Sequence, residues 1–331
     1  MTFCISFTKI RNRIMSKKTA LIIWVGWQDG TILRDFLTSK NYVIIWISRN
    51  KNTYHWIVGT EKHTDILDTN QVDILIKRHK PDEIYYLAAY HHSSQDIIPN
   101  DQVVFKESTN IHVNGYFNIL QAVAKYSPKS KICYASSCLI YGWSDTQQQN
   151  EKTLPAPNSI YAITKLEGMH LGNRFAEKYN IQVINTILYN HESQFRSANF
   201  VSMKIIQWAI KISQWIQNTI TLGDISTQVD RGYAWDYIEA MFWLLQSDKK
   251  WDYIVSSWSL HTIQDLIEIV FNYLGLDWKK HIIIDKNIIQ RKKWLLYGDT
   301  IKIIKDINWK PKIWFNKMIL EMTKKAKKYM K

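Results

Sequence analysis

Residues 19–48 read TALIIWVGWQDGTILRDFLTSKNYVIIWIS, and this stretch decides the fold. The apolar run 19–23 predicts a buried strand, the spacing in residues 31–41 predicts a helix, and the apolar run 42–48 predicts a second strand. A strand, a short turn, a helix and a second strand form the opening unit of a dinucleotide-binding fold. We therefore expect residues 24–30 to form the turn at the helix N-terminus where such folds bind phosphate.

The alternation of strands and helices continues along the chain. Residues 81–92 (PDEIYYLAAYHH) and 131–142 (KICYASSCLIYG) predict strands, and residues 108–127 between them predict a helix. This order predicts an α/β fold, a Rossmann-type doubly wound parallel sheet with right-handed crossovers.

The 331 residues are enough for one large domain or two modest ones. We expect residues 1–14 to be a non-structural extension, with the true start at Met15. Residues 15–186 are predicted to form the Rossmann domain, and a later segment at about 219–250 returns to it. Residues 187–331 are predicted to form mainly a smaller C-terminal α/β region that binds the substrate.

A tyrosine and a lysine stand four residues apart in Tyr161-Ala-Ile-Thr-Lys165. On a helix they lie on one face, one turn apart. A free phenol has a pKa of about 10, and a neighbouring ammonium group favours the phenolate, which accepts protons. Ser137 supplies the third group, a hydroxyl, at the end of a predicted strand, where open α/β sheets place their chemistry. The same spacing also occurs by chance, so the surrounding motifs must decide.

Charge and composition exclude several classes of binding partner. The net charge of +14 is spread along the chain, apart from the lysine-rich end 323–331, and accompanies no nucleic-acid-binding motif. We therefore expect no nucleic-acid partner. No signal-peptide core and no apolar run of about 18 residues occurs, so no membrane partner is expected either. Cys4, Cys133 and Cys138 lack metal-site spacing and leave one thiol unpaired, which favours a reduced cytoplasmic setting and predicts no metal.

Several motifs in register resemble an extended short-chain dehydrogenase/reductase of the NAD-dependent epimerase/dehydratase group. They are WQDG at 27–30, LAA at 87–89, the Tyr161/Lys165 pair, LYNHES at 188–193, FVSMKI at 200–205, GYAWDYIEAM at 232–241, LGLDW at 274–278 and NWKP at 308–311. Within that group the chain is similar to GDP-mannose 4,6-dehydratases from about residue 19 to about residue 320. The resemblance implies a lyase of nucleotide-sugar metabolism that acts on GDP-mannose with bound NADP. We also expect a homo-oligomer.

Tryptophan stands where this family has glycine. The family's phosphate turn reads Thr-Gly-x-x-Gly-x-x-Gly, and Trp24 and Trp27 occupy two of its three glycine positions. The same exchange recurs at Trp46, Trp215 and Trp258, and is also expected at Trp294. The chain has 15 tryptophans and only 11 glycines, a glycine share of 11/331, about half the usual ~7%. Our hypothesis is recoding: a UGA codon, read as glycine in the source organism, was translated here as tryptophan. The alternative is a genuine homologue that binds no cofactor.

The resemblance implies a set of cofactor-binding residues. They are Trp24, Trp27, Gln28, Asp29, Gly30, Arg49, Asp65, Leu87, Ala88, Ala89, Tyr161 and Lys165. Arg49 follows the second predicted strand, where a cation favours the ribose 2′-phosphate of NADP over the hydroxyl of NAD. Asp65 matches a position that contacts adenine, although an aspartate in a turn often only caps local backbone groups.

The resemblance also implies the catalytic roles. Tyr161 takes the proton of the sugar 4-hydroxyl, Lys165 lowers the pKa of Tyr161, and Ser137 binds the same oxygen. Asn190, Lys204 and Arg291 match positions that contact the nucleotide diphosphate. His191 and Glu192 lie in a matching block, where chemical and packing roles both stay open.

Two departures from the family pattern bear on the reaction. Leu139 stands where the family has a glutamate that removes the C5 proton, and Val229 replaces an arginine that grips the diphosphate. Leucine cannot accept a proton. A 4-reductase or 4-epimerase is therefore the alternative to a dehydratase, and a non-catalytic binding protein follows if Trp24 and Trp27 are genuine. His92 is our candidate for a substitute base, because its strand end should face the same cleft.

Overall fold

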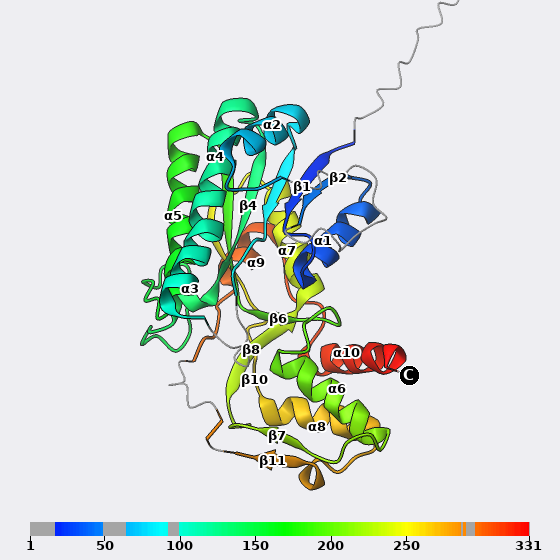
Figure 1. Cartoon of the computed structure of the whole chain (residues 1–331). Helices are drawn as coiled ribbons and strands as arrows, with labels where there is room; N and C mark the ends of the chain where they lie inside the picture. The colour runs from blue at the N-terminus through cyan, green and yellow to red at the C-terminus, as the bar shows by residue number, and fades with distance from the viewer. Residues whose placement is uncertain (1–16, 49–63, 92–98, 286, 289–294, 331) are drawn as a thin grey trace, which may run out of the picture.

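The computed structural model describes residues 17–48, 64–91, 99–285, 287–288 and 295–330. Its centre is a parallel sheet with the strand order β2-β1-β3-β4-β5-β9 (Figure 1). These strands are β1 (Thr19–Ile23), β2 (Val43–Ile47), β3 (Glu83–Tyr86), β4 (Lys131–Ser137), β5 (Gln182–Leu188) and β9 (Trp251–Val255). All neighbours in this sheet run parallel, which confirms the predicted Rossmann-type doubly wound sheet.

Helices cover both faces of the sheet (Figure 1). On one face α1 (Gln28–Ser39) packs against α7 (Ala234–Gln246), and on the other α2 (Thr69–His79), α4 (Gly115–Tyr126) and α5 (Ile160–Tyr179) lie side by side. α4 continues a helix that begins as α3 (Asp101–Thr109) and widens into a π turn, η1 (Asn110–Asn114). The strands lie between the two helical layers and are buried on both faces, which is why their sequences consist mainly of apolar residues. Within the described part of the chain, no helix is both long and apolar enough to cross a membrane.

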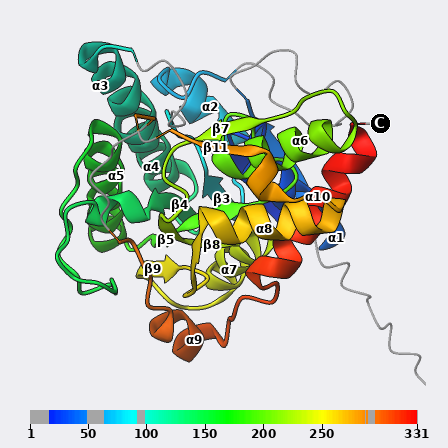
Figure 2. The ribbon, with the colours of Figure 1, turned by 90° about the horizontal axis from the view of Figure 1, so that it is seen from below.

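A smaller part lies at the carboxyl edge of the large sheet (Figures 1 and 2). It contains the three-stranded sheet β10-β8-β6 and the parallel pair β11-β7. Its elements are β6 (Asn190–Glu192), α6 (Val201–Ser213), β7 (Ile220–Leu222), β8 (Gln228–Tyr233), β10 (Leu260–Thr262), α8 (Ile263–Leu274), η3 (Trp278–Lys280), β11 (Ile282–Ile284) and α10 (Phe315–Tyr329). Apolar side chains of α6, α8, α10 and β7 form a separate core.

The chain passes between the two cores several times. After β6, α6 and β7 in the smaller part, α7 and β9 return to the core of the large sheet, and later α9 (Ile301–Ile307) and Trp309 do the same. Ile220 and Leu222 of β7 are buried in the smaller core. The stretch from Ala234 of α7 to Val255 of β9 contributes buried residues to the core of the large sheet.

The register of the sheet brings several predicted segments to one edge. Ile23 pairs with Tyr86, which pairs with Tyr134, and Ser137 pairs with Leu188. The turn after β1, the segment after β3 and the end of β4 therefore follow neighbouring strand ends. In open α/β sheets this carboxyl edge is where ligands bind.

Four tryptophans adopt a left-handed backbone conformation. φ is +83° at Trp24, +62° at Trp215, +79° at Trp251 and +45° at Trp258. A side chain is disfavoured in this region because its Cβ approaches a carbonyl oxygen, whereas glycine enters freely. The other non-glycine residues with positive φ in the described part of the chain are three asparagines and Lys80. Trp251 thus joins three positions already expected to be glycine, and this backbone geometry supports the recoding hypothesis.

Candidate active site

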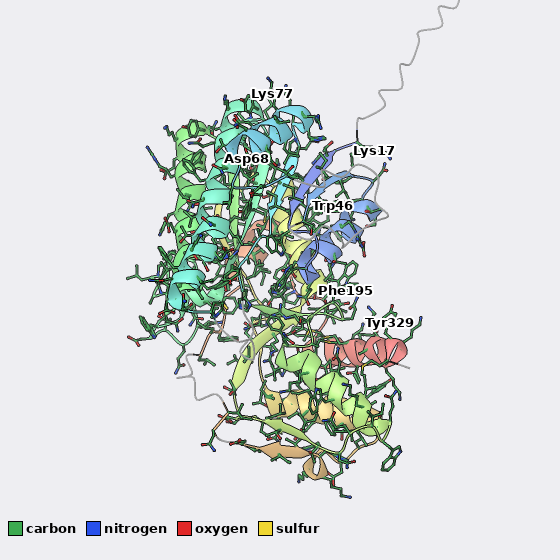
Figure 3. The ribbon with its side chains drawn as sticks, viewed as in Figure 1. Lys17, Trp46, Asp68, Lys77, Phe195 and Tyr329 are labelled. Carbon is green, nitrogen blue, oxygen red and sulfur yellow. The ribbon has the colours of Figure 1, made fainter. Side chains whose placement is uncertain are left out.

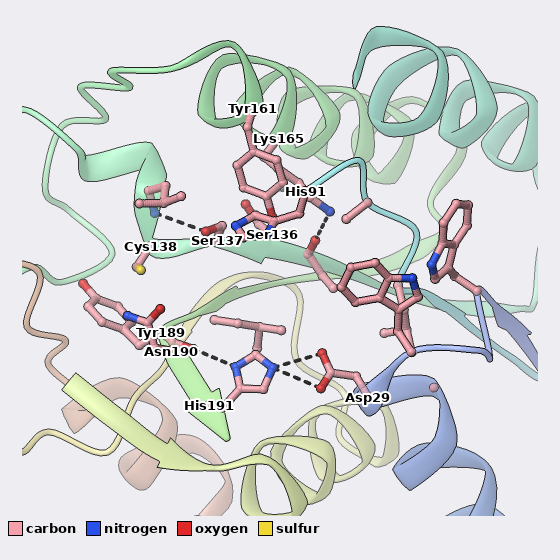
Figure 4. A pocket seen from close by; sticks show the side chains of 18 of the residues that line it. Asp29, His91, Ser136, Ser137, Cys138, Tyr161, Lys165, Tyr189, Asn190 and His191 are labelled. Carbon is pink, nitrogen blue, oxygen red and sulfur yellow. Dashed lines mark hydrogen bonds and ion pairs between the residues drawn. The ribbon is translucent and has the colours of Figure 1, made fainter. Parts of the chain in front are cut away.

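The three predicted catalytic residues meet in one cleft at the carboxyl edge of the large sheet (Figure 4). Ser137 ends β4 and is followed by the short helix η2 (Cys138–Tyr141). Tyr161 and Lys165 lie on the first turns of α5, which begins after Ser159 because that side chain accepts a hydrogen bond from the backbone N–H of Ala162. Other predicted residues that line the cleft are Trp24, Trp27, Asp29, Gly30, Leu87, Ala89 and Asn190.

The remaining predicted residues lie elsewhere. Ala88 contributes its carbonyl oxygen to Lys165, and Gln28 is buried and donates to the carbonyl oxygen of His191. Asp65 and Lys204 are not among the residues that line the cleft. The Asp65 carboxylate accepts a hydrogen bond from the backbone N–H of Leu67 at 2.9 Å. This contact matches the alternative given above, in which the aspartate caps backbone groups of a local turn. Arg49, His92, Arg291 and Trp294 lie outside the described residues.

Lys165 is buried beneath Tyr161, the predicted catalytic tyrosine. Its Nζ donates hydrogen bonds to the carbonyl oxygens of Ala135 at 2.7 Å and Ala88 at 3.2 Å, and it lies 6.0 Å from the centre of the Tyr161 ring. Burial lowers the pKa of Lys165 to about 7, and attraction from Asp29 offsets part of this shift. A group with this pKa can exchange a proton near neutral pH.

Tyr161 is half-buried among aromatic neighbours. Its ring makes edge contacts with His91 at 4.9 Å and with His112 at 5.2 Å between ring centres. Burial and the nearby Cys138 raise the pKa of the Tyr161 phenol, while the Ser137 hydroxyl and Arg196 lower it in part. The sequence predicted a lowered pKa, but in this structure burial of the phenol outweighs the stabilising groups.

An ion pair joins the first turn of α1 to the smaller part of the chain (Figure 4). His191 Nε2 lies 3.0 and 3.1 Å from the two carboxylate oxygens of Asp29, and its Nδ1 lies 2.7 Å from the Tyr189 carbonyl oxygen. Burial by itself raises the pKa of Asp29 and lowers the pKa of His191, but their mutual attraction and hydrogen bonds outweigh it. The pKa of Asp29 therefore lies below its usual 3.8, and the pKa of His191 lies above its usual 6.5.

This pair makes the stability of the fold depend on pH. The Asp29 contribution is present above pH 3.8 and is lost as the pH falls through its lowered pKa; the His191 contribution is present below pH 6.5 and is lost as the pH rises through its raised pKa. We expect Asp29→Asn to lower the melting temperature most at about pH 5–6, with a smaller difference above about pH 8. Thermal denaturation across this range measures the effect.

A control on the same helix is Asp35→Asn. Asp35 is 43% exposed and pairs with Arg34 at 2.6 Å, and such surface pairs contribute little to stability. We expect a small difference in melting temperature that is constant between about pH 5 and 8. A constant difference for Asp29→Asn as well would contradict an ion pair at His191.

Two indole side chains conflict with a dinucleotide in this cleft. Trp24 and Trp27 both line it, and Trp27 is 43% exposed there. Gly30 at the start of α1 fits the family pattern, because a Cβ atom at this residue would lie 2.5 Å from the carbonyl oxygen of residue 24. In so tight a turn, the backbone N–H groups can bind a phosphate group only if no side chain lies between them and the phosphate. The cleft therefore fits a dinucleotide with glycine at positions 24 and 27, and does not fit it with tryptophan.

Trp46 differs from these two residues. It lies on β2 in the core of the large sheet and is only 4% exposed (Figure 3). Its φ is not in the left-handed region. The backbone therefore gives no independent reason for glycine at position 46.

Sequence reasoning missed two residues of the cleft and its wall. The Arg196 guanidinium lies 3.7 Å over the Phe200 ring and reaches the cleft, and it also pairs with the buried Glu192 at 3.5 Å. No motif marked it. His112 is fully buried behind Tyr161, and the signal for it was a histidine within an otherwise apolar helical pattern. Among the described residues no three His, Cys, Asp or Glu side chains cluster as metal ligands.

A family model described as GDP-mannose 4,6 dehydratase matches residues 21–322. The chain belongs to this family. The match spans both parts of the fold, from β1 to α10, and includes every described residue of the cleft. The family is one of nucleotide-sugar dehydratases, which places the chain among enzymes.

Two relatives from this family align with the chain over most of their own length. GDP-mannose 4,6 dehydratase 1 of Arabidopsis thaliana is 30% identical over 95% of this chain and 93% of its own. The human GDP-mannose 4,6 dehydratase is 29% identical over 92% of this chain and 90% of its own. The family resemblance inferred from the motifs is therefore confirmed.

Solved structures share the fold at lower identity. RMD from Pseudomonas aeruginosa, complexed with NADPH, has a TM-score of 0.80 at 19% identity, covering 95% of this chain and 100% of its own. A UDP-glucose 4-epimerase from Thermotoga maritima, with UDP-glucose, has a TM-score of 0.81 at 16% identity with the same coverage. This chain therefore shares the fold of both structures.

Proposed function

We propose that the chain is a GDP-mannose 4,6-dehydratase, which converts GDP-mannose to GDP-4-keto-6-deoxymannose with bound NADP. The observation that carries the proposal is the meeting of Ser137, Tyr161 and Lys165 in one cleft with the phosphate turn, Leu87 and Ala89. Relatives at about 30% identity carry the name of this activity, and a structural neighbour is complexed with NADPH. Arg49 favours NADP over NAD by its position after β2.

Each catalytic residue has a role set by its place in the cleft. Bound NADP supplies the hydride acceptor for oxidation at C4 of the sugar. Tyr161 takes the proton of the 4-hydroxyl, and Ser137 hydrogen bonds to the same oxygen. Lys165, held by two carbonyl oxygens below the ring, compensates the negative charge that develops on the phenol.

The nucleotide diphosphate is assigned to the smaller part of the chain. Asn190 lines the cleft from β6, and Lys204 follows on α6 with its ammonium group 5.8 Å from the Trp208 ring. Burial lowers the pKa of Lys204. A phosphate oxygen beside this ammonium group would raise its pKa again by charge attraction. Arg291 completes the proposed set, and we propose a cytoplasmic homo-oligomer for the assembled enzyme.

Leu139 favours a second candidate function. It lines the cleft in η2, two residues after Ser137. Among the described residues that line the cleft, Asp29 is the only carboxylic acid, and it is paired with His191. Oxidation or reduction at C4 needs only the tyrosine, lysine and serine, whereas elimination also needs a base for the C5 proton. A 4-reductase or 4-epimerase on a related nucleotide sugar is therefore the alternative.

A histidine is the best substitute base available. His91 lines the cleft and contacts the Tyr161 ring, and His92, the residue named from the sequence, follows it in the chain. Histidine titrates near neutral pH and suits proton abstraction. We propose that one of this pair removes the C5 proton.

The two functions separate in deuterated water. We expect the chain with glycine at positions 24, 27, 46, 215, 251 and 258, called the glycine form below, to convert GDP-mannose into a 4-keto-6-deoxy product that carries solvent deuterium. The deuterium marks C5, where elimination removes a proton and a proton from solvent is added when the resulting double bond is reduced. Product mass measures it, and His91→Ala and His92→Ala identify the base by losing dehydration.

The opposite outcome has a clear signature. If GDP-mannose returns unchanged while NADPH reduces a 4-keto nucleotide sugar, the dehydratase proposal is wrong and the 4-reductase takes its place. Loss of both activities in Tyr161→Phe, in either case, shows that the reaction occurs in this cleft rather than in a contaminating enzyme.

A further inference from the structure

His112 lies at the junction of two walls of the cleft. It belongs to the π turn η1, where the helix widens, and its side chain is fully buried. Widened turns of this kind occur often at functional sites because they displace one residue from the regular helical hydrogen-bond pattern. Here the displacement brings the imidazole between α5 and the segment that follows β3.

Both ring nitrogens of His112 have partners. The backbone N–H of Tyr90 donates to Nε2 at 3.0 Å, and Nδ1 lies 2.8 Å from the Thr164 hydroxyl oxygen. Because a backbone N–H can only donate, Nε2 carries no proton. Nδ1 is then the protonated nitrogen of the neutral ring and donates to Thr164. The geometry therefore allows a single tautomer.

The two hydrogen bonds reach different functional groups. Thr164 stands between Tyr161 and Lys165 on α5, and its hydroxyl lies 3.0 and 3.1 Å from the carbonyl oxygens of Ile160 and Tyr161, so it can pass the hydrogen bond to the first turn of the helix. Tyr90 closes the segment 87–90, whose Ala88 carbonyl holds Lys165 and whose Leu87 and Ala89 line the cleft. The imidazole also supports the Tyr161 ring edge-on.

We propose that His112 is a positioning residue that fixes the catalytic helix through Thr164 and the cofactor-facing segment through Tyr90. The inference rests on the proposed function only in assigning the cleft to a dinucleotide and Tyr161 to proton transfer. It does not depend on the sugar. His112 stays neutral in this role, because an imidazolium would direct an N–H at the Tyr90 N–H and place a second cation beside Lys165 and His91. Burial, Lys165 and His91 all lower the pKa of His112 well below its usual value.

Two substitutions separate the two hydrogen bonds. Asparagine places an amide nitrogen near the position of Nδ1, and glutamine places an amide oxygen near the position of Nε2. His112→Asn thus keeps the donor to Thr164 and loses the acceptor for Tyr90, whereas His112→Gln does the reverse. Thr164→Val removes the hydroxyl at constant shape and serves as the partner variant for His112→Gln.

We expect opposite effects in the glycine form. His112→Asn weakens NADP binding about tenfold in calorimetry, the loss expected for one hydrogen bond, and changes kcat at saturating cofactor less than twofold. His112→Gln keeps the NADP affinity within twofold and lowers kcat about tenfold, since small displacements of a catalytic group cost at least this much. Adding Thr164→Val to His112→Gln produces no further loss, because both remove the same hydrogen bond.

A spectroscopic measurement tests the tautomer without any substrate. In long-range proton–nitrogen spectra of histidine-labelled protein, the signals absent from His112→Gln identify His112. We expect the neutral form protonated at Nδ1 from pH 6 to 8. A form protonated at Nε2, or an imidazolium, would overturn the proposal. Equal losses of affinity and of kcat in both variants would show a merely structural role and overturn it as well. If GDP-mannose is not a substrate, the NADP affinities and the spectrum still test the positioning role of His112.

Discussion

We expect turnover to fall by about 10²-fold to 10⁴-fold when Tyr161 is replaced by phenylalanine, because the substitution removes the phenol oxygen to which we assign the proton of the sugar hydroxyl. The fold should survive, since the ring keeps its edge contacts with His91 and His112. Steady-state kinetics of the glycine form measure the loss, and the melting temperature confirms that the variant is folded. The loss should be in kcat, with little change in the KM of the nucleotide sugar.

Tyr126→Phe is the matched control for this experiment. It removes a tyrosine hydroxyl that donates to Asp73 at 3.0 Å, at the end of α4 and away from the cleft. We expect wild-type turnover from this variant. Tyr161→Phe with full turnover would remove the phenol from the mechanism.

The second large effect concerns the cofactor. We expect the glycine form to bind NADP about 10²-fold to 10⁴-fold more tightly than the chain with tryptophan, because backbone N–H groups of the turn then reach the phosphates, and each charge-assisted hydrogen bond contributes about 1.5–3 kcal/mol. Glycine at positions 24, 215, 251 and 258 should each also raise stability, since a left-handed tryptophan costs about 1–2 kcal/mol. Calorimetry and thermal denaturation measure the two gains.

Trp215→Gly alone separates these gains. Trp215 is 91% exposed, has a left-handed φ and does not line the cleft. The single substitution should raise the melting temperature without improving NADP affinity. A glycine form that binds no NADP would favour a cofactor-free homologue, as would indole masses at positions 24 and 27 in the native protein. Equal affinity for NADP and NAD would remove Arg49 from cofactor selection.

Sequence reasoning located the parallel sheet because both of its faces are buried. Runs such as residues 19–23 and 131–137 read as strands without any tertiary information, and the strand ends then fixed which polar residues could meet. The smaller part was harder to predict, because its strands β6, β7, β10 and β11 have three residues each, too few for a period to show.

The environment of the site was less predictable than its members. The Tyr161/Lys165 spacing places both residues on one face, but it does not reveal that Lys165 is turned toward the Ala88 and Ala135 carbonyl oxygens. The direction of the Tyr161 pKa shift depends on how deeply the phenol is buried, which spacing does not encode. His112 acts across three elements, and only the folded chain shows that its two nitrogens have different partners.

The strand order has a consequence for synthesis on the ribosome. β9 is the sixth strand of the large sheet and pairs with β5, yet it lies at residues 251–255, after much of the smaller part. During translation the outer edge of β5 therefore stays open until more than 60 further residues have been made, counting from Leu188 to Trp251. An open strand edge invites pairing with other chains. Nascent chains released before residue 255 should thus aggregate, and the cofactor-binding sheet should close only when most of the polypeptide has emerged.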